Sequence, residues 1–495
     1  MASTGAPTPP IEFGGEASAT AARLSGRSVP VAEPVLERLR GACAVVTTEP
    51  DARREASRDW WPLAMIWALD NQVAGLAGAV VAPSSSTEVA DVLRIAHEAV
   101  IPVTAAAGRS GVCGASVPLH GGILLDLSNF EGIVDVDTTS LVLDVAPGTF
   151  GTWLEDTLRT EWQLTLGHWP QSIDLSTVGG WLACRSAGQL STRYGKIEDM
   201  VVGLDVVLAD GRTIHTGGSP RAAVGPDLNQ LFVGSEGTLG VITGARLRLR
   251  PRPLVEIRAA FGFSSFDDGI AACRQILHRG ATPAVLRLYD AVEADRSFTT
   301  GDRHVVLVLD EGDQNLIESG LDLVLSICLD AGAERLSDDL VDRWVEHRND
   351  VSALEALISR GYVVDTMEIA ASWRALPTIY EAATAAIRAV PGALVASGHL
   401  SHSYPDGACL YFTFAGQPPP DRRDAFYDAA WTAGTRAVLE HGGALSHHHG
   451  VGLNRARFVR DALGEAFDVL AATKQALDPK GILNPGKLGL PDAFA

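Results

Sequence analysis

Three consecutive histidines stand in a glycine-bounded segment near the end of the chain. His447, His448 and His449 lie in GGALSHHHGVG, residues 442–452. Histidine changes charge near neutral pH and is the commonest metal ligand in proteins. The run therefore has three interpretations: acid/base and oxyanion chemistry, a metal site, or a polar turn. Of these we favour acid/base chemistry.

A metal site would need histidines from a second segment. GHLSHSYPDGACL, residues 398–410, supplies His399 and His402, and neutral imidazole nitrogens suit zinc. Consecutive residues of an extended strand point to opposite faces, so at most two of three adjacent histidines reach one site. Binding through His399, His402 and His448 stays an alternative, and our prediction is that no metal binds.

Three more polar residues stand where chemistry is plausible. His168 follows a glycine in GHWP, Arg287 lies in the apolar stretch VLRLYD, and Tyr411 lies in CLYF. Each also has a structural interpretation: a loop histidine with its hydrogen bonds satisfied, a cation on an edge strand, and a tyrosine that only packs. We take all three as catalytic candidates together with the histidine run.

Glycine is concentrated in three segments that could hold an anion. They are AAAGRSGVCG (105–114), GHWPQSIDLSTVGGWLACRSAG (167–188) and LFVGSEGTLGVITGARLRLRP (231–251). Small residues let backbone N–H groups converge on a diphosphate. The first segment follows a predicted strand but matches neither GxGxxG nor the P-loop pattern, so a Rossmann fingerprint and a P-loop are both excluded.

Length and composition limit the number of domains and the kinds of partner that this chain can have. A chain of 495 residues exceeds the usual size of a single core, so two or more domains are expected. The formal net charge of −20 argues against nucleic-acid partners and against an anionic membrane surface. The six cysteines form no CxxC pair, the N-terminus has no secretory signal pattern, and no apolar stretch approaches the roughly 20 residues of a membrane span. A cytoplasmic protein is predicted.

The order of elements predicts an α+β fold. Strand–helix–strand pieces precede a DG turn at Asp210 and Gly211 between two antiparallel strands. PRPL, residues 251–254, marks a boundary, and strands alternate with helices beyond it. Four segments are expected, with bounds at residues 1–70 (an N-terminal arm and helical cover), 71–252, 253–440 and 441–495.

The three glycine-rich segments, in this order, resemble the FAD-binding domain of the vanillyl-alcohol oxidase / p-cresol methylhydroxylase superfamily. STVGGWLACRSAGQLSTRYGKIEDMVV, YPDGACLYF and SHHHGVG look most like alkyldihydroxyacetonephosphate synthase and its bacterial FAD-linked oxidase relatives. The resemblance implies a two-subdomain FAD-binding domain at 71–252 and an α+β substrate cap at 253–440. It also implies that residues 441–495 return to the flavin site.

The resemblance assigns FAD contacts to four groups of residues. From the first segment these are Ala105, Ala106, Ala107, Gly108, Arg109, Ser110 and Gly111. From the second they are Gln171, Ser172, Ile173, Asp174, Leu175, Ser176 and Thr177, followed by Cys184, Arg185, Ser186 and Ala187. From the third they are Glu236, Gly237, Thr238, Leu239, Gly240, Val241 and Ile242. Arg109 stands where the family has glycine, so it either adds a cation at the diphosphate or points away.

Relatives that tether FAD use a histidine in the first segment or a cysteine in the second. GRSGVCG has no histidine and HWPQSIDLS has no cysteine, so noncovalent FAD is predicted. The same relatives take small-molecule substrates, and we expect one here. A homodimer is left open as the assembly.

Three reactions are compatible with the resemblance. We expect an FAD-dependent oxidoreductase that transfers hydride from a hydroxylated small molecule to flavin N5. The alternatives are a redox-neutral ether-lipid transferase like the synthase and an FAD-linked D-2-hydroxyacid dehydrogenase with a metal. The synthase pattern puts an arginine where this chain has Leu354, and leucine cannot pair with a phosphate. That departure favours oxidation.

Overall fold

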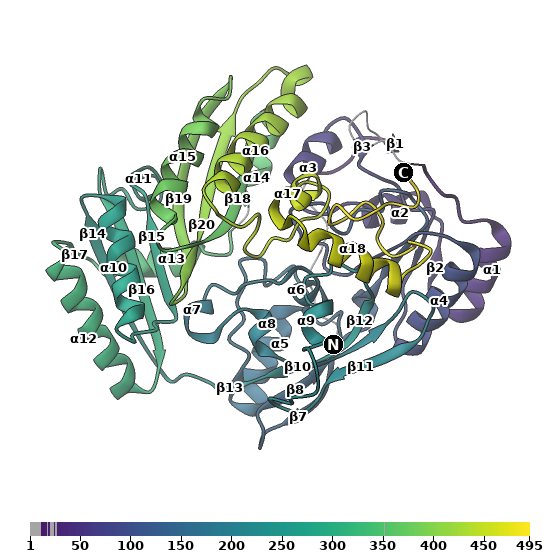
Figure 1. Ribbon diagram of the computed structural model, residues 1–495, viewed down its shortest axis with the longest axis horizontal. Coiled ribbons are helices and arrows are strands. Elements are labelled where there is room, and N and C mark those ends of the chain that lie inside the picture. The colour runs from purple at the N-terminus through teal and green to yellow at the C-terminus, as the bar shows by residue number, and fades with distance from the viewer. Residues whose placement is uncertain (1–10, 17, 20–23, 25–26, 351) are drawn as a thin grey trace.

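The protein is described by a computed structural model that covers residues 11–16, 18–19, 24, 27–350 and 352–495. Three large sheets organise this part of the chain (Figure 1). Two of them lie in the N-terminal half, the third is built from later residues, and the C-terminal segment lies back against the first half. None of the helices within the described ranges is long and apolar enough to cross a membrane.

The first sheet has four strands in the order β2 (Val46–Thr47), β4 (Ala79–Val81), β6 (Ile123–Asp126) and β5 (Val103–Ala106). The last three run parallel, as expected where a helix connects the strands. Helix α4 (Ser86–Ala99) begins where the Ser85 side chain accepts the Glu88 N–H, and it ends at a left-handed Val100. Its buried residues Val89, Val92, Leu93 and Ala96 recur at helical spacing and pack on the sheet with α1 (Glu33–Ala42).

The second sheet is antiparallel, in the order β11 (Thr213–Gly217), β10 (Val201–Val207), β12 (Val241–Arg248), β8 (Val142–Val145) and β7 (Ile133–Asp137). The expected DG turn joins β10 to β11, and Gly211 adopts a φ of +82° there. An apolar core packs this sheet against α5 (Gly151–Thr157) and α6 (Val178–Cys184).

The third sheet, called the cap sheet below, has seven strands, and every neighbouring pair is antiparallel. Its order is β17 (Glu334–Leu336), β14 (Val255–Phe263), β16 (His304–Gly312), β15 (Val285–Tyr289), β19 (Ala393–Ser403), β20 (Gly407–Gly416) and β18 (Val363–Ser372). One face is covered by α10 (Phe266–His278), α12 (Gln314–Asp330), α15 (Leu376–Arg388) and α16 (Arg423–Glu440).

Side chains alternate between the two faces of the cap sheet. In β15, Leu286 and Leu288 pack against the helices, whereas Arg287 and Tyr289 point to the opposite face. Because β15 lies between β16 and β19, the interpretation of Arg287 as an edge-strand cation is wrong. The helix-free part of this face is where the polar candidates gather.

The shorter elements connect these sheets. Residues 1–70, where a helical cover was expected, contain α1, α2 (Pro50–Ala56) and α3 (Pro62–Ala68). The others are β1 (Ser18–Ala19), β3 (Gln72–Val73), β9 (Leu164–Thr165), α7 (Ser191–Tyr194), α8 (Ile197–Met200), α9 (Asn229–Phe232), β13 (Arg250–Pro251), α11 (Ala291–Phe298), α13 (Asp339–His347), α14 (Ser352–Ser359), α17 (Val459–Leu463) and α18 (Ala466–Leu477). After α18, Leu483 pairs in parallel with Val103 of β5, so the C-terminal segment extends the first sheet.

Candidate active site

The first and second glycine-rich segments pack directly on each other. β5 ends at Ala106, and a Cβ added at Gly108 would lie 2.3 Å from the carbonyl oxygen of Leu175. No side chain fits in that space, so glycine is required for the close approach of the two backbones. Ser176 and Thr177 follow, and the Thr177 hydroxyl accepts the Gly180 N–H at the start of α6.

The third segment joins both of the others. The N–H of Glu236 donates to the carbonyl of Ala183 in α6 at 2.9 Å. On the other side, a Cβ at Gly237 would lie 3.7 Å from the Cβ of Ala105 in the first segment. The side-chain amide of Asn484 donates to the Glu236 carbonyl at 2.7 Å, which ties the C-terminal segment to the same point. The predicted cofactor segments therefore converge.

The side chain of Arg109 is held away from this convergence by an acid. Its Nη1 donates to Oδ2 of Asp126 at 3.0 Å, and Asp126 ends strand β6. Arg109 itself has a φ of +50°, a conformation that suits a tight turn. Of the two roles expected for Arg109, the ion pair supports the one in which the side chain points away and only the backbone serves the loop.

His168 is buried where the second segment folds back on itself. Its Nε2 lies 3.2 Å from the hydroxyl of Ser186, and its ring packs against Trp181 at 4.7 Å between centroids. Burial lowers the pKa of His168 to about 3, so the ring is neutral. Its Nδ1 is buried without a partner among the described residues, as is Oδ1 of Asn484. These unpaired atoms and the converging loops fit a bound polar cofactor such as FAD.

A row of four side chains crosses the open face of the cap sheet. Glu368 of β18 lies opposite Tyr411 of β20, Tyr411 opposite His399 of β19, and His399 opposite Tyr289 of β15. The ring centroids of Tyr411 and His399 are 4.9 Å apart with the planes 7° from parallel, and those of His399 and Tyr289 are 5.0 Å apart. Strand register alone places these residues side by side.

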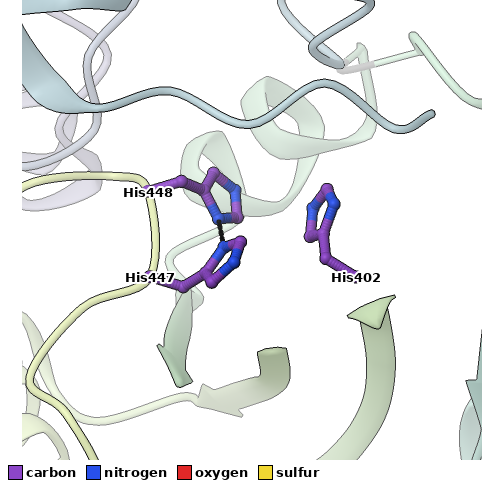
Figure 2. Close-up of side chains that lie close together, drawn as sticks. All are labelled: His402, His447 and His448. Carbon is purple, nitrogen blue, oxygen red and sulfur yellow. Dashed lines mark hydrogen bonds between the residues drawn. The ribbon is translucent and has the colours of Figure 1, made fainter. Parts of the chain in front are cut away.

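The histidine loop, residues 446–450, meets this row at Tyr411. The Tyr411 hydroxyl lies 3.0 Å from Nε2 of His448 and 2.7 Å from Nε2 of His449. A hydroxyl has one proton, so one imidazole accepts from Tyr411 and the other donates to it. His447 points to Tyr404, with its Nε2 3.0 Å from that hydroxyl, and its Nδ1 lies 2.8 Å from Nδ1 of His448 (Figure 2).

Burial determines the charge state of Tyr411 and of the three histidines. Burial lowers the pKa of His447 to about 3 and that of His449 to about 4. Burial, reinforced by His449, His402 and His447, also lowers the pKa of His448 well below its ordinary value. Burial also raises the pKa of Tyr411, which Glu368 reinforces. At neutral pH the histidines are therefore neutral and the tyrosine is protonated, so the group can both accept and donate a proton.

Glu368 fixes the histidine loop to the sheet. Its carboxylate accepts hydrogen bonds from the Ser446 hydroxyl and the His449 N–H, both at 2.9 Å, and from the N–H groups of His447 and His448. Arg455 pairs with it at 3.0 Å, and both side chains are fully buried. Burial alone would raise the pKa of Glu368, but Arg455 and the hydrogen bonds lower it to about 2.

A second buried carboxylate orients His399. Nη2 of Arg287 lies 2.9 Å from Nε2 of His399, and Nδ1 of His399 lies 2.6 Å from Oε2 of Glu293 in α11. Arginine only donates, so Nε2 accepts and Nδ1–H donates to Glu293. Burial lowers the pKa of His399, which agrees with a neutral ring. Both ring nitrogens are thereby used, and His399 has none left for a metal.

The structure changes the composition of the alternative metal site. His402, His447 and His448 each offer a ring nitrogen, and these atoms lie within 4.8 Å of one another, whereas His399 is not in this group. Figure 2 shows His402 facing the other two from the cap sheet. Nδ1 of His402 lies 2.8 Å from the Ser191 hydroxyl, which leaves its Nε2 free for the group.

His402 reaches this position because β19 contains a bulge. His399 lies opposite Tyr411 and His402 opposite Cys409, and the register shifts between Leu400 and His402. Ser401 is the extra residue. Two histidines three positions apart in a regular strand would point to opposite faces, and the bulge brings both to the open face.

Several residues of the site were not among the candidates from the sequence. They are Glu293, Glu368, Tyr404 and Arg455. One signal in the sequence could have found Glu368, because it interrupts the mostly apolar stretch of β18. Leu354, where the synthase pattern has arginine, packs against the apolar core on the helical side of the cap sheet.

Comparisons with known proteins agree with this arrangement. Residues 77–217 match the family described as FAD binding domain, and residues 252–488 match FAD linked oxidases, C-terminal domain. The uncharacterized FAD-linked oxidoreductase YgcU of Escherichia coli O157:H7 is 31% identical over 430 residues, which cover 83% of this chain and 88% of YgcU. Alkyldihydroxyacetonephosphate synthase of Dictyostelium discoideum is 29% identical over 455 residues, covering 84% of this chain and 74% of the synthase.

Solved structures agree with the fold. An alkyldihydroxyacetonephosphate synthase structure superposes with a TM-score of 0.77 at 24% identity, over 93% of this chain and 87% of the synthase. p-Cresol methylhydroxylase with substrate bound gives 0.76 at 16% identity, over 94% and 99%. The predicted α+β fold, with an FAD-binding domain followed by a second α+β domain, is confirmed, as is the resemblance that predicted it. The chain therefore belongs to the FAD-linked oxidase family, and FAD is its cofactor.

Proposed function

We propose that the protein oxidises a hydroxylated small molecule, with Tyr411, His448 and His449 as the groups that take the hydroxyl proton. FAD, when bound, supplies the acceptor for the two electrons. The observation that carries the proposal is the Tyr411 hydroxyl held between two neutral imidazoles at 3.0 and 2.7 Å. A substrate hydroxyl beside Tyr411 can pass its proton to the tyrosine oxygen while the tyrosine proton moves to a histidine.

Arg287 supports the same step from the neighbouring strand. Its guanidinium is bound by His399 and by the hydroxyl of Tyr289, and it remains 9% exposed on the open face of the cap sheet. A fixed cation next to the row stabilises negative charge as it develops on the substrate oxygen. His168 is neutral and has one ring nitrogen free, so we assign it a hydrogen bond to substrate or cofactor.

A redox-neutral transfer like that of alkyldihydroxyacetonephosphate synthase is the main alternative, because that relative is similar over most of the chain. It would use the same tyrosine and histidines. Leu354 weighs against it, since this partly buried side chain packs against an apolar core at the position where the synthase pattern has an arginine. A metal-dependent 2-hydroxyacid dehydrogenase is favoured by the ring nitrogens of His402, His447 and His448, which lie within 4.8 Å of one another.

Anaerobic mixing of the FAD-loaded enzyme with a panel of alcohols and 2-hydroxy acids tests the proposal. We expect one class of compound to bleach the flavin absorbance. Tyr411→Phe, His448→Ala and His449→Ala should each slow that bleaching by about two to four orders of magnitude, the range for losing a general acid or base. Flavin content and Tm should barely change.

The control is His441→Ala, an exposed histidine close to the loop in the chain. Its bleaching rate should equal that of the unaltered enzyme. Unchanged bleaching in all three site variants would refute the assignment of the proton-transfer groups. A panel without any bleaching, together with exchange of an acyl for an alkoxy group, would refute oxidation and establish the transfer.

A further inference from the structure

We infer that Arg348 forms an anion subsite for the substrate, at the junction between the cap and the second glycine-rich segment. Arg348 directly follows α13, and its backbone carbonyl accepts a hydrogen bond from the side-chain amide of Gln189 at 3.1 Å. This inference deepens the proposed function, on which it rests, because it gives the substrate a negative charge as well as a hydroxyl.

The guanidinium of Arg348 lies against two tryptophans and pairs with no acid in the part of the chain that the structure describes. Its central carbon is 5.6 Å from the ring centroid of Trp344 in α13 and 5.6 Å from that of Trp169 in the second segment. Within the described ranges, the side chain of Arg348 makes no hydrogen bond and no ion pair. Burial lowers the pKa of Arg348, and the more distant charges oppose one another, since Glu256 and Glu311 raise it whereas Arg159 and Arg258 lower it. A half-buried cation without a partner is costly unless a ligand supplies the counter-charge.

Two unpaired polar atoms belong to residues that contact Arg348, namely Trp169 and Gln189. The indole Nε1 of Trp169 is buried and has no acceptor among the described residues, and the side-chain oxygen of Gln189 is buried and has no donor. Gln189 is only 8% exposed. The indole N–H and the guanidinium can both donate to an anionic oxygen, while the Gln189 oxygen can accept from a hydroxyl. Together they suit a hydroxylated organic anion.

Contacts connect this position to the reacting groups. Trp344, on which Arg348 lies, also contacts Arg287, whose guanidinium carbon is 5.4 Å from the same ring centroid. Arg287 binds His399, and His399 stacks on Tyr411. One tryptophan ring therefore separates the proposed subsite from the row on the cap sheet. The carbon skeleton of the substrate would span from Arg348 to Tyr411.

The subsite also accounts for Leu354. The position that would hold a phosphate-binding arginine is apolar in this chain. Arg348 is six residues earlier in sequence, outside α14, and contacts residues of both domains. An anion held there would lie between the domains instead of against the core of the cap. A carboxylate and a phosphate monoester share the required chemistry.

Binding of inorganic phosphate and of acetate to the full-length, FAD-loaded protein tests this inference without requiring turnover. Calorimetric titration at constant ionic strength gives each Kd. We expect measurable binding, with the tighter anion identifying the source as phosphate or carboxylate. Arg348→Gln should weaken that binding at least about tenfold, as expected for loss of hydrogen bonds to a charged group. Trp169→Phe, which keeps the ring face but removes the N–H, should weaken it by a smaller factor.

Arg360→Gln is the matched control, since Arg360 is exposed and lies after α14. It should bind the anions as the unaltered protein does. No binding of either anion to the unaltered protein, or equal Kd values for Arg348→Gln and Arg360→Gln, would overturn the inference. If Arg348→Gln does not fold, Trp169→Phe with an unchanged Kd overturns it. Flavin bleaching in Tyr411→Phe is a separate readout. The anion subsite can therefore be refuted while the proposed oxidation stands, and the oxidation can be refuted while the subsite stands.

Discussion

Replacing Glu368 by glutamine should destabilise the cap and release the histidine loop. The carboxylate is fully buried, pairs with the fully buried Arg455, and accepts hydrogen bonds from Ser446 and from three consecutive backbone N–H groups. Glutamine has nearly the same shape but no charge, so Arg455 would be left as an uncompensated buried cation. Removing one partner of a buried pair costs about 3–5 kcal/mol.

The pKa of Glu368 gives a second estimate of the stability lost in Glu368→Gln. Its fall from an ordinary 4.5 to about 2 corresponds to about 3 kcal/mol of stability. Because the folded-state pKa is depressed, this stability is fully present above about pH 4.5 and is lost as the pH falls towards 2. The difference between native protein and Glu368→Gln should therefore be largest near neutral pH and shrink below about pH 4.5.

Thermal unfolding followed by circular dichroism between pH 7 and pH 3 measures both effects. For a unit of about 150–250 residues, 3 kcal/mol lowers Tm by about 6–12 °C. Glu440→Gln, at the exposed end of α16, is the control and should leave Tm unchanged at every pH. Arg455→Met added to Glu368→Gln should recover part of the loss, because the unpaired cation is then gone. A loss below about 1 kcal/mol, or one that does not vary with pH, would refute the reasoning.

Two further predictions concern the cofactor and metals. Acid precipitation should leave FAD in the supernatant, because the first segment has no histidine and residues 168–176 of the second segment contain no cysteine that could tether it; colour retained in the pellet would contradict noncovalent binding. Dialysis against a chelator should leave the rate of flavin bleaching unchanged, as expected for histidines that serve Tyr411; activity lost to the chelator, restored by zinc and abolished by His402→Ala would instead establish a metal at His402, His447 and His448.

The sequence predicted what depends on local pattern. Helix α4 could be predicted because it has a serine cap and apolar residues at helical spacing. The turn between β10 and β11 could be predicted because Asp210–Gly211 is a turn signal between two strands with alternating apolar residues. The candidates Tyr411, His448 and His449 could be named because motifs carry them. The structure brings them within hydrogen-bond distance of one another.

What the sequence could not predict depends on contacts between distant segments. β15 pairs with β19, more than a hundred residues later, and only this pairing places Arg287 next to His399. Glu368 was not a candidate because its role is to bind the backbone of a loop far along the chain, and a backbone N–H leaves no mark in the sequence. The exclusion of His399 from the metal-capable group likewise follows from Glu293, which occupies its Nδ1.

The bulge at Ser401 also affects how this chain should be aligned with its relatives. Ser401 has no opposite residue in β20, so a chain that lacked it would still place the two histidines opposite Tyr411 and Cys409. A separation of two or of three residues is thus equivalent at this point, although only the shorter one obeys strict alternation. A one-residue gap within LSH is therefore no evidence that a relative has lost either imidazole. A sequence search that demands a fixed spacing between the two histidines would reject proteins that carry the same side chains on this face of the sheet.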